Sequence, residues 1–266
     1  MSERTLNALN GAVSISVELD EEPEKARILA DKLALPVVSV TGDVSRNPPP
    51  ADAVRLRFRD GKLQALSLDQ SGGQFLVETD FLNVTTAKRL LRARSELVVK
   101  AVQGRQKSAL TILDATVGLA GDAMLLAAMG HTVIGLERAP LVYEIVADGI
   151  ERARSAGVID LPELIQVDAL EWLTGHPEQL FDVIYLDPMF EATGKQALPR
   201  KQMQLLRQVG SDLTGIENLF HYARQRAGLR VVVKRPPKGE WLVEPPAYSI
   251  KGQRVRFDIY SPIRTK

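Results

Sequence analysis

The feature that most constrains the fold is an alternation of short β-branched runs with helical patterns that begins at residue 111. Helical segments of about 10 to 15 residues separate these runs, which is typical of parallel βαβ units. The expected strands are 111–113, 132–136, 164–167, 182–186 and 229–233, and the expected helices are 122–129, 141–156, 201–209 and 216–226. The pattern predicts a doubly wound α/β sheet with a ligand crevice at the carboxyl ends of its strands. Residues 254–260 alternate and predict an antiparallel edge strand.

The first 84 residues differ in texture and predict a small α+β domain. Residues 13–19 and 36–40 read as strands around a helix that Pro23 opens. Two further alternating segments flank Asp60-Gly61, a strong hairpin signal. We therefore expect two domains, 1–84 and 85–266, with the larger sheet in the second.

Composition removes several classes of function. The chain of 266 residues has no Cys, which excludes disulfides, thiolate metal sites and cysteine nucleophiles. Its three His are scattered without ligand spacing, so we expect no metal. No apolar stretch reaches the roughly 18 residues of a membrane span, and residues 1–10 lack a signal-peptide pattern. We expect a cytoplasmic protein with no membrane partner.

An acidic residue follows each of four expected strands: Asp114, Glu137, Asp168 and Asp187. A single Asp after a strand is commonly a turn former or a helix N-cap. Four at successive strand ends are harder to explain in that way. They predict an acidic crevice.

The turn after the first of these strands, residues 114–122, indicates the kind of ligand. It lacks the full G-x-G-x-x-G pattern and the Lys-Ser/Thr of a phosphate-binding loop. Glu137 lies 19 residues after Gly118, where a carboxylate can accept hydrogen bonds from a ribose diol. Adenosine without a pyrophosphate is implied, and the cationic S-adenosylmethionine (SAM) suits acidic walls. The alternative is a glycine turn that serves only close helix–strand packing.

The most specific motif is Asp187-Pro188-Met189-Phe190 after the fourth strand. It resembles the Asp/Asn-Pro-Pro-Tyr/Phe signature of methyltransferases that act on exocyclic amines of bases. Asp187 and the Pro188 carbonyl would accept hydrogen bonds from such an amine, and Phe190 would stack on the base. We therefore expect Asp187, Pro188 and Phe190 to be the catalytic residues.

Several longer runs extend this resemblance over about residues 78–260. In order, they are LDATVGLAGDAMLLAAMG, VIYLDPMF, VVVKRP and RFDIY. Together they resemble the bacterial ribosomal RNA small subunit methyltransferase J family, guanine-N2 enzymes that use SAM and have a class I, Rossmann-like fold. The resemblance implies that the substrate is a guanosine near the 3′ end of 16S rRNA. The partner would be either the rRNA itself or the small ribosomal subunit.

The cofactor-binding residues expected from the turn and from the resemblance are Asp114, Gly118, Gly121, Asp122, Glu137, Arg138, Asp168, Ala169 and Asp187. The chain departs from the family at Gly121, where members usually have Arg, and in the loop 191–197. These departures concern how the methionine carboxylate is held and how the substrate is recognised.

The near-zero net charge of +1 hides a strong segregation. Residues 109–194 hold 14 acidic and three basic residues, whereas 195–266 hold 15 basic and five acidic ones. Residues 85–108 are also basic, with seven basic residues and one acidic residue. Basic segments that flank an acidic block can supply phosphate contacts to RNA, and the cations expected to do so are Lys195, Lys201, Lys234 and Arg235. Trp172 and Trp241 are candidates for stacking on bases, although Trp172, in a helix after Asp168, is expected rather to pack or to line the adenine pocket.

Three alternatives remain open from the sequence. One is a nicotinamide-dependent oxidoreductase on the same architecture, which the imperfect glycine fingerprint disfavours. Another is a methyltransferase of a different nucleic-acid amine, such as adenine N6. The third is an RNA-binding module without catalytic activity, which would be favoured if Asp187 and Glu137 did not share one crevice.

Overall fold

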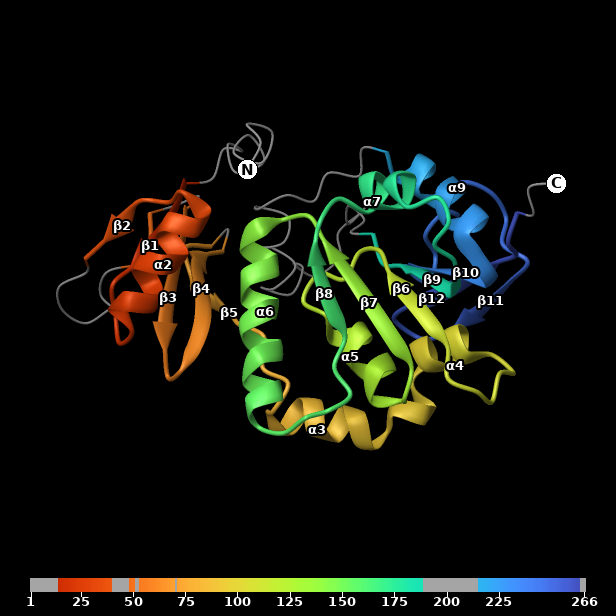
Figure 1. The fold of residues 1–266 in the computed structure, drawn as a ribbon, viewed down its shortest axis with the longest axis horizontal. Coiled ribbons are helices and arrows are strands. Elements are labelled where there is room, and N and C mark those ends of the chain that lie inside the picture. Colours follow the sequence, from red (N-terminus) through yellow and green to blue (C-terminus); the bar gives the residue numbers. More distant parts are fainter. Residues whose placement is uncertain (1–13, 40–47, 51–52, 70, 189–214, 264–266) are drawn as a thin grey trace. The chain divides into compact units, whose positions relative to one another are not determined.

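A computed structural model of the chain describes residues 14–39, 48–50, 53–69, 71–188 and 215–263. The described residues form two compact units. The first takes its described residues from Met1–Asp80 and Ala139–Arg152, and the second takes them from Phe81–Arg138, Ala153–Phe190 and Leu213–Lys266. The helices and strands of the two units are drawn in Figure 1.

The first unit contains a five-stranded sheet in the order β2-β1-β3-β4-β5. Its elements are β1 (Ser14–Glu18), α2 (Pro23–Leu33), β2 (Val37–Val38), β3 (Ala53–Arg59), β4 (Lys62–Leu68) and β5 (Gln74–Val77). The hairpin predicted around Asp60-Gly61 joins β3 to β4, and both turn residues have positive φ, 52° and 67°. This is the backbone that two-residue hairpin turns require. Strand β5 was not predicted from the sequence.

Most of helix α6 (Pro140–Ser155) belongs to the same unit, which includes residues Ala139–Arg152. Asp148 Oδ2 accepts the backbone N–H of Leu63 at 3.1 Å. Lys32 of α2 forms an ion pair with Glu144 at 2.6 Å. A segment from the middle of the chain is thus joined to the N-terminal sheet by side-chain contacts.

The second unit contains a seven-stranded sheet in the order β11-β12-β10-β9-β6-β7-β8. Its strands are β6 (Thr111–Asp114), β7 (Thr132–Glu137), β8 (Glu163–Gln166), β9 (Phe181–Leu186), β10 (Ala227–Arg235), β11 (Tyr248–Lys251) and β12 (Arg256–Tyr260). The five strands from β6 to β10 are parallel where they pair. The predicted doubly wound α/β sheet is confirmed.

One detail of the prediction was wrong. The strand expected at the edge of the sheet, β12, is antiparallel as predicted, but it lies between β10 and β11. The hairpin between β11 and β12 is closed by the Gly252 N–H bonded to the Val255 carbonyl at 2.8 Å. The short segment β11 therefore takes the edge position, which its four residues did not indicate.

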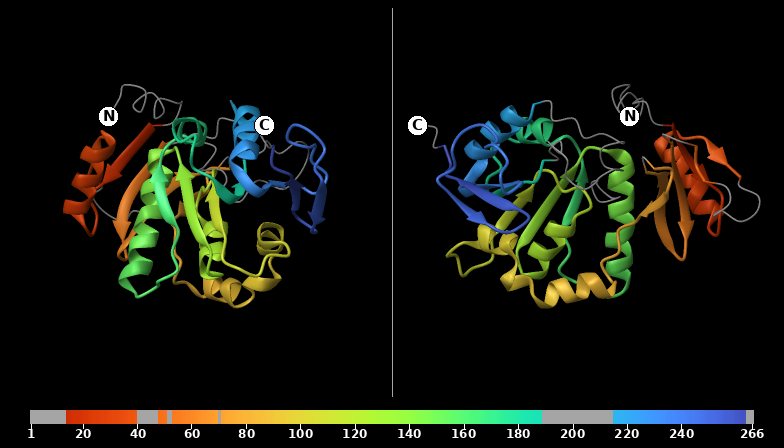
Figure 2. Two further views of the ribbon diagram at one scale, coloured as in Figure 1. Left: turned by 45° about the vertical axis from the view of Figure 1, so that its right-hand side comes forward. Right: turned by 180° about the vertical axis from the view of Figure 1, so that it is seen from behind.

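The helices of the second unit lie on both faces of its sheet (Figure 2). They are α3 (Val84–Leu91), α4 (Leu97–Gln103), α5 (Gly121–Ala128), α7 (Ala169–Gly175) and α9 (Ile216–Arg226), with a short 3₁₀ turn, η2 (Ala93–Ser95), before α4. Helices α7 and α9 pack against each other, and α5 contacts α3 and α4. The helix expected at 201–209 lies outside the described residues.

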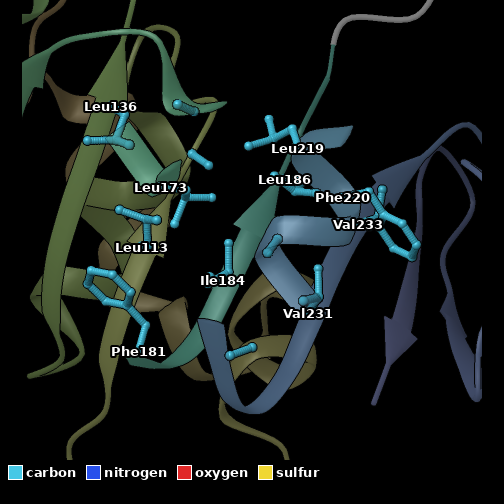
Figure 3. Packing of buried hydrophobic residues seen from close by; sticks show 14 of the residues in the cluster. Leu113, Leu136, Leu173, Phe181, Ile184, Leu186, Leu219, Phe220, Val231 and Val233 are labelled. Atoms are coloured by element: carbon cyan, nitrogen blue, oxygen red, sulfur yellow. The ribbon is translucent and has the colours of Figure 1, made fainter. Parts of the chain in front are cut away.

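The alternation of side chains along the central strands decides which residues meet which layer. Ile184 and Leu186 of β9 belong to the apolar cluster that also holds residues of α7 and α9 (Figure 3). Tyr185, between them, must therefore project from the opposite face of the sheet, where its hydroxyl reaches Asp122 in α5. In β10, Val231 and Val233 likewise join the cluster. The same period of two directs Lys234 to the α5 face.

Candidate active site

The acidic residues predicted to line the crevice lie at the carboxyl ends of the parallel strands. Asp114 and Glu137 are the last residues of β6 and β7. Asp187 follows β9 directly, and Asp168 comes two residues after β8. Because parallel strands end at one edge of the sheet, these four carboxylates lie along the same edge.

Asp122, in the first turn of α5, is the centre of a hydrogen-bonded network. Its Oδ2 accepts the Tyr185 hydroxyl at 2.8 Å and the Lys234 ammonium at 3.0 Å. Its Oδ1 accepts Arg89 Nη2 at 2.6 Å. Arg89 also donates from Nη1 to the carbonyl of Gly121 at 2.9 Å. Four elements, α3, α5, β9 and β10, therefore converge on this one carboxylate.

Asp187 is held through both its backbone and its side chain. Its N–H donates to Thr116 Oγ1 at 2.6 Å, which fixes the turn after β9 against the turn after β6. Its Oδ2 accepts the Lys234 ammonium at 2.7 Å, while 36% of the side chain stays exposed. Pro188 is buried, and Phe190 lies outside the described residues.

The carboxylates differ in acidity because their neighbours differ. Burial raises the pKa of Asp114 well above its usual range, and the charges of Asp122 and Asp187 raise it further. The pKa of Asp187 is also raised by burial, with the Lys234 charge opposing the shift. Burial acts on Asp122 in the same direction, but Lys234 and Arg89 outweigh it and lower the pKa of Asp122 to about 2. Asp122 is therefore an ionised anchor at neutral pH.

The turn between β6 and α5 is packed directly on β7. The Gly118 N–H donates to Glu137 Oε2 at 3.1 Å, and Gly118 and Ala120 have positive φ values of 53° and 57°. A Cβ at Gly135 would lie 2.7 Å from Val117 Cγ2, closer than real Cβ contacts allow. Asp187 and Glu137 are thus both hydrogen-bonded to the segment Asp114–Gly118, so they lie near each other at the carboxyl ends of the strands. Their proximity disfavours the alternative of an RNA-binding module without catalytic activity.

Asp168 has a structural role in addition to its predicted one. Its Oδ1 accepts the N–H groups of Leu170 and Glu171 at 2.9 and 3.1 Å, so it caps α7. Its Oδ2 lies 3.9 Å from Arg138 Nη1. Ala169 is buried behind the cap. The common N-cap reading applies to Asp168, whereas Asp187 caps no described helix.

The cations predicted to contact RNA fall in different places. Lys234 is bonded to Asp122 and Asp187 inside the site. Arg235 is buried, and its Nε donates to the Glu240 carbonyl at 2.8 Å. Lys195 and Lys201 lie outside the described residues.

Sequence reasoning missed three members of this network: Arg89, Thr116 and Tyr185. The signal for Tyr185 was available, since it occupies the odd position of an apolar strand whose neighbours Ile184 and Leu186 face the core. Arg89 carried no comparable signal. It comes from α3, and its contact with Asp122 joins residues 33 positions apart in the chain.

Comparison with known proteins shows which protein family the chain belongs to. Residues 45–262 match the family described as "Putative SAM-dependent methyltransferase". A ribosomal RNA small subunit methyltransferase J from Marinobacter nauticus is 36% identical over 91% of this chain and 88% of its own length. The chain belongs to this methyltransferase J family. The relative of that name from Coxiella burnetii is also 36% identical, over 95% of this chain and 98% of its own length.

A solved structure supports the same assignment. The SAM-dependent methyltransferase from Neisseria gonorrhoeae aligns with a TM-score of 0.66 and 28% identity, covering 95% of this chain and 98% of that one. The predicted class I, Rossmann-like fold and the use of SAM are therefore confirmed for this methyltransferase. The oxidoreductase alternative is set aside.

The residues present fit SAM in charge, because carboxylates such as Asp114, Asp122 and Glu137 could stabilise its sulfonium and ammonium groups. Glu137 at the end of β7 has the position from which a carboxylate accepts a ribose diol. Among the described residues there is no cluster of His, Asp and Glu suited to a metal ion. None of the helices in those residues is long and apolar enough to span a membrane.

Proposed function

We propose that this methyltransferase transfers the methyl group of SAM to the exocyclic N2 amine of a guanosine in 16S rRNA, in the cytoplasm. The observation that carries the proposal is the Asp187-Pro188 turn at the end of β9, with the Asp187 carboxylate partly exposed at the crevice. The names of the relatives, ribosomal RNA small subunit methyltransferase J, support RNA of the small subunit as the substrate.

The chemistry of the amine explains why an Asp-Pro turn suits it. The lone pair of a guanine N2 amine is delocalised into the ring, so the amine must be held and oriented before it reacts. The Asp187 carboxylate and the Pro188 carbonyl would each accept one N–H. Phe190, the third predicted catalytic residue, would stack on the base. Orientation of this kind contributes much of the acceleration in a direct displacement.

SAM, when bound, supplies a methyl group activated by its sulfonium. The amine nitrogen forms a bond to the methyl carbon as the carbon–sulfur bond breaks, and the bonding pair stays on sulfur. The nitrogen then releases one proton to water, which restores a neutral amine. No residue of the chain needs to form a covalent bond with the substrate.

We assign the cofactor contacts to the residues at the strand ends. Glu137 would accept the ribose hydroxyls, with Arg138, Asp168 and Ala169 beside the adenine. The remaining contacts, to the methionine part, would come from Asp114, Gly118, Gly121, Asp122 and Asp187. The N–H of Gly118 fixes Glu137 for its role before the cofactor arrives.

For RNA, the loop after β10 offers an exposed aromatic on a fixed support. The side chain of Trp241 is 53% exposed. Arg235, the last residue of β10, donates from Nε to the carbonyl of Glu240, the residue before Trp241, at 2.8 Å. Leu242, the residue after Trp241, packs against the core cluster. We propose that Trp241 stacks on a base next to the target guanosine, and that Arg235, Lys195 and Lys201 contribute positive charge to RNA binding.

The two tryptophans make this contact measurable by fluorescence. Titration of the W172F variant, which retains Trp241, with single-stranded RNA containing guanosine is expected to quench the emission. The W241F variant, which retains the buried Trp172, is expected to show no quenching. Loss of the stacking in W241A should raise KM for RNA by about 10-fold. Quenching that persists in W241F would rule out this contact.

The proposed reaction is tested by incubating the protein with labelled SAM and unmethylated small-subunit rRNA and identifying the product by nucleoside mass spectrometry. N2-methylguanosine is the expected product. N6-methyladenosine would establish the alternative amine. No labelled nucleoside, with either naked rRNA or small subunits, would refute RNA methylation by this protein.

A further inference from the structure

Lys234 lies beside Asp187 in the site but has no role in the proposed methyl transfer itself. It is the eighth residue of β10, and its side chain lies on the α5 face, opposite the apolar cluster that takes Val231 and Val233. Its ammonium bridges two carboxylates, with Asp187 Oδ2 at 2.7 Å and Asp122 Oδ2 at 3.0 Å. The side chain is 25% exposed. A lysine that served RNA phosphates would instead direct its ammonium to solvent.

The bridge connects two parts of the site that have different partners. Asp122 is fixed from the other side by Arg89 and Tyr185, so it is an anchored carboxylate. Asp187 is at the other end of the bridge: its backbone N–H is bonded to Thr116, and its side chain is partly exposed. Because the Lys234 ammonium is bonded to both carboxylates, the anchored Asp122 restricts where the Asp187 carboxylate can lie.

We propose that Lys234 is a positioning residue for methyl transfer, which holds Asp187 ionised and directs its Oδ1 towards the substrate amine. With Oδ2 bonded to the ammonium, Oδ1 accepts one amine N–H. A carboxylate held in this way orients the amine but is a weak base. The proton that leaves the methylated nitrogen therefore goes to water. This inference rests on the proposed function only in requiring an exocyclic amine as the acceptor.

The charged environment of Asp187 gives the inference a pH signature. The groups that interact with it electrostatically are Lys234 on β10, Asp122 on α5, Asp114 on β6, Tyr185 on β9 and, through Asp122, Arg89 on α3. Burial and Asp122 raise the pKa of Asp187, and Lys234 is the group that lowers it. Activity that needs the ionised carboxylate is lost as the pH falls through this raised pKa. Removal of Lys234 moves that loss to higher pH.

The test measures single-turnover methyl transfer by wild type, K234M, K234Q and K234R at saturating SAM between pH 5 and 8. In K234M and K234Q we expect kcat to fall by about 100-fold, the magnitude for loss of one positioned hydrogen-bond donor, with the acid limb shifted to higher pH. KM for RNA should stay within about threefold. K234R, which keeps the charge, should retain the wild-type acid limb.

Binding of S-adenosylhomocysteine identifies the variants that are folded. Of the neutral variants K234M and K234Q, only one that binds S-adenosylhomocysteine is used to judge the proposal. If neither neutral variant folds, an acid limb in K234R that matches wild type supports the proposal and a shifted one overturns it. The control is K25M, at an exposed lysine of α2 paired with Glu22. A raised KM with unchanged kcat and pH profile would overturn the proposal in favour of a phosphate contact. Wild type that methylates no amine would refute the proposed function itself.

Discussion

The D187A variant is expected to lose methyl transfer almost completely, with a single-turnover rate at least about 1,000-fold below wild type. Two effects combine in this loss. The substrate amine loses the acceptor that orients it, and the Lys234 ammonium loses one of its two carboxylate partners. Binding of S-adenosylhomocysteine should weaken by about 10-fold, since Asp187 is also one of the proposed cofactor contacts.

D187N separates orientation from charge, because the amide keeps the shape of the carboxylate and can still accept one hydrogen bond. We expect D187N to be slower than wild type by about 100-fold and to retain cofactor binding. D160A, at an exposed aspartate between α6 and β8, is the matched control and should match wild type. A D187A variant with more than about a tenth of the wild-type rate would refute the proposed role of the Asp-Pro turn.

The E137A variant is expected to bind S-adenosylhomocysteine about 30- to 100-fold more weakly in calorimetry. Each charge-assisted hydrogen bond to a ribose hydroxyl contributes about 1.5–3 kcal/mol, and 1.4 kcal/mol corresponds to a factor of ten. The variant also loses the carboxylate that accepts the Gly118 N–H and steadies the turn. At saturating SAM its rate of methyl transfer should remain within about threefold of wild type.

The control for this prediction is E163A. Glu163 begins β8, so it is exposed at the edge of the sheet opposite the crevice, and its removal should leave the dissociation constant unchanged. An unchanged dissociation constant in E137A would show that the ribose contact lies elsewhere. A parallel drop in the transfer rate at saturation would place Glu137 in the chemistry of the reaction.

The main features of the larger sheet could be predicted because they rest on local patterns. The five parallel strands are short β-branched runs, and α9 spans Ile216–Arg226 as the periodicity indicated. The carboxylates Asp114, Glu137 and Asp187 could be found because topology alone places strand ends at one edge. The short strands β5 and β11 were missed, because they lie outside the strand–helix alternation that identified the equally short β6 and β8.

Other features depend on contacts that no local pattern contains. Lys234 was interpreted as a phosphate ligand because the sequence shows its charge but not its partners, which lie 112 and 47 residues away. The alternation of side chains in VVVKRP places Lys234 on the face opposite Val231 and Val233, which is the face from which Tyr185 projects. Arg89 belongs to a basic segment that reads as a solvated surface, and only the fold brings it to Gly121 and Asp122.

The account is tested most directly by nucleoside mass spectrometry of small-subunit rRNA from cells that lack this protein, complemented with wild type or with D187A. We predict that one N2-methylguanosine per small subunit disappears in the deletion, returns with wild type and stays absent with D187A. A content of N2-methylguanosine that does not change across these strains would contradict the proposal that the Asp187 turn methylates guanosine.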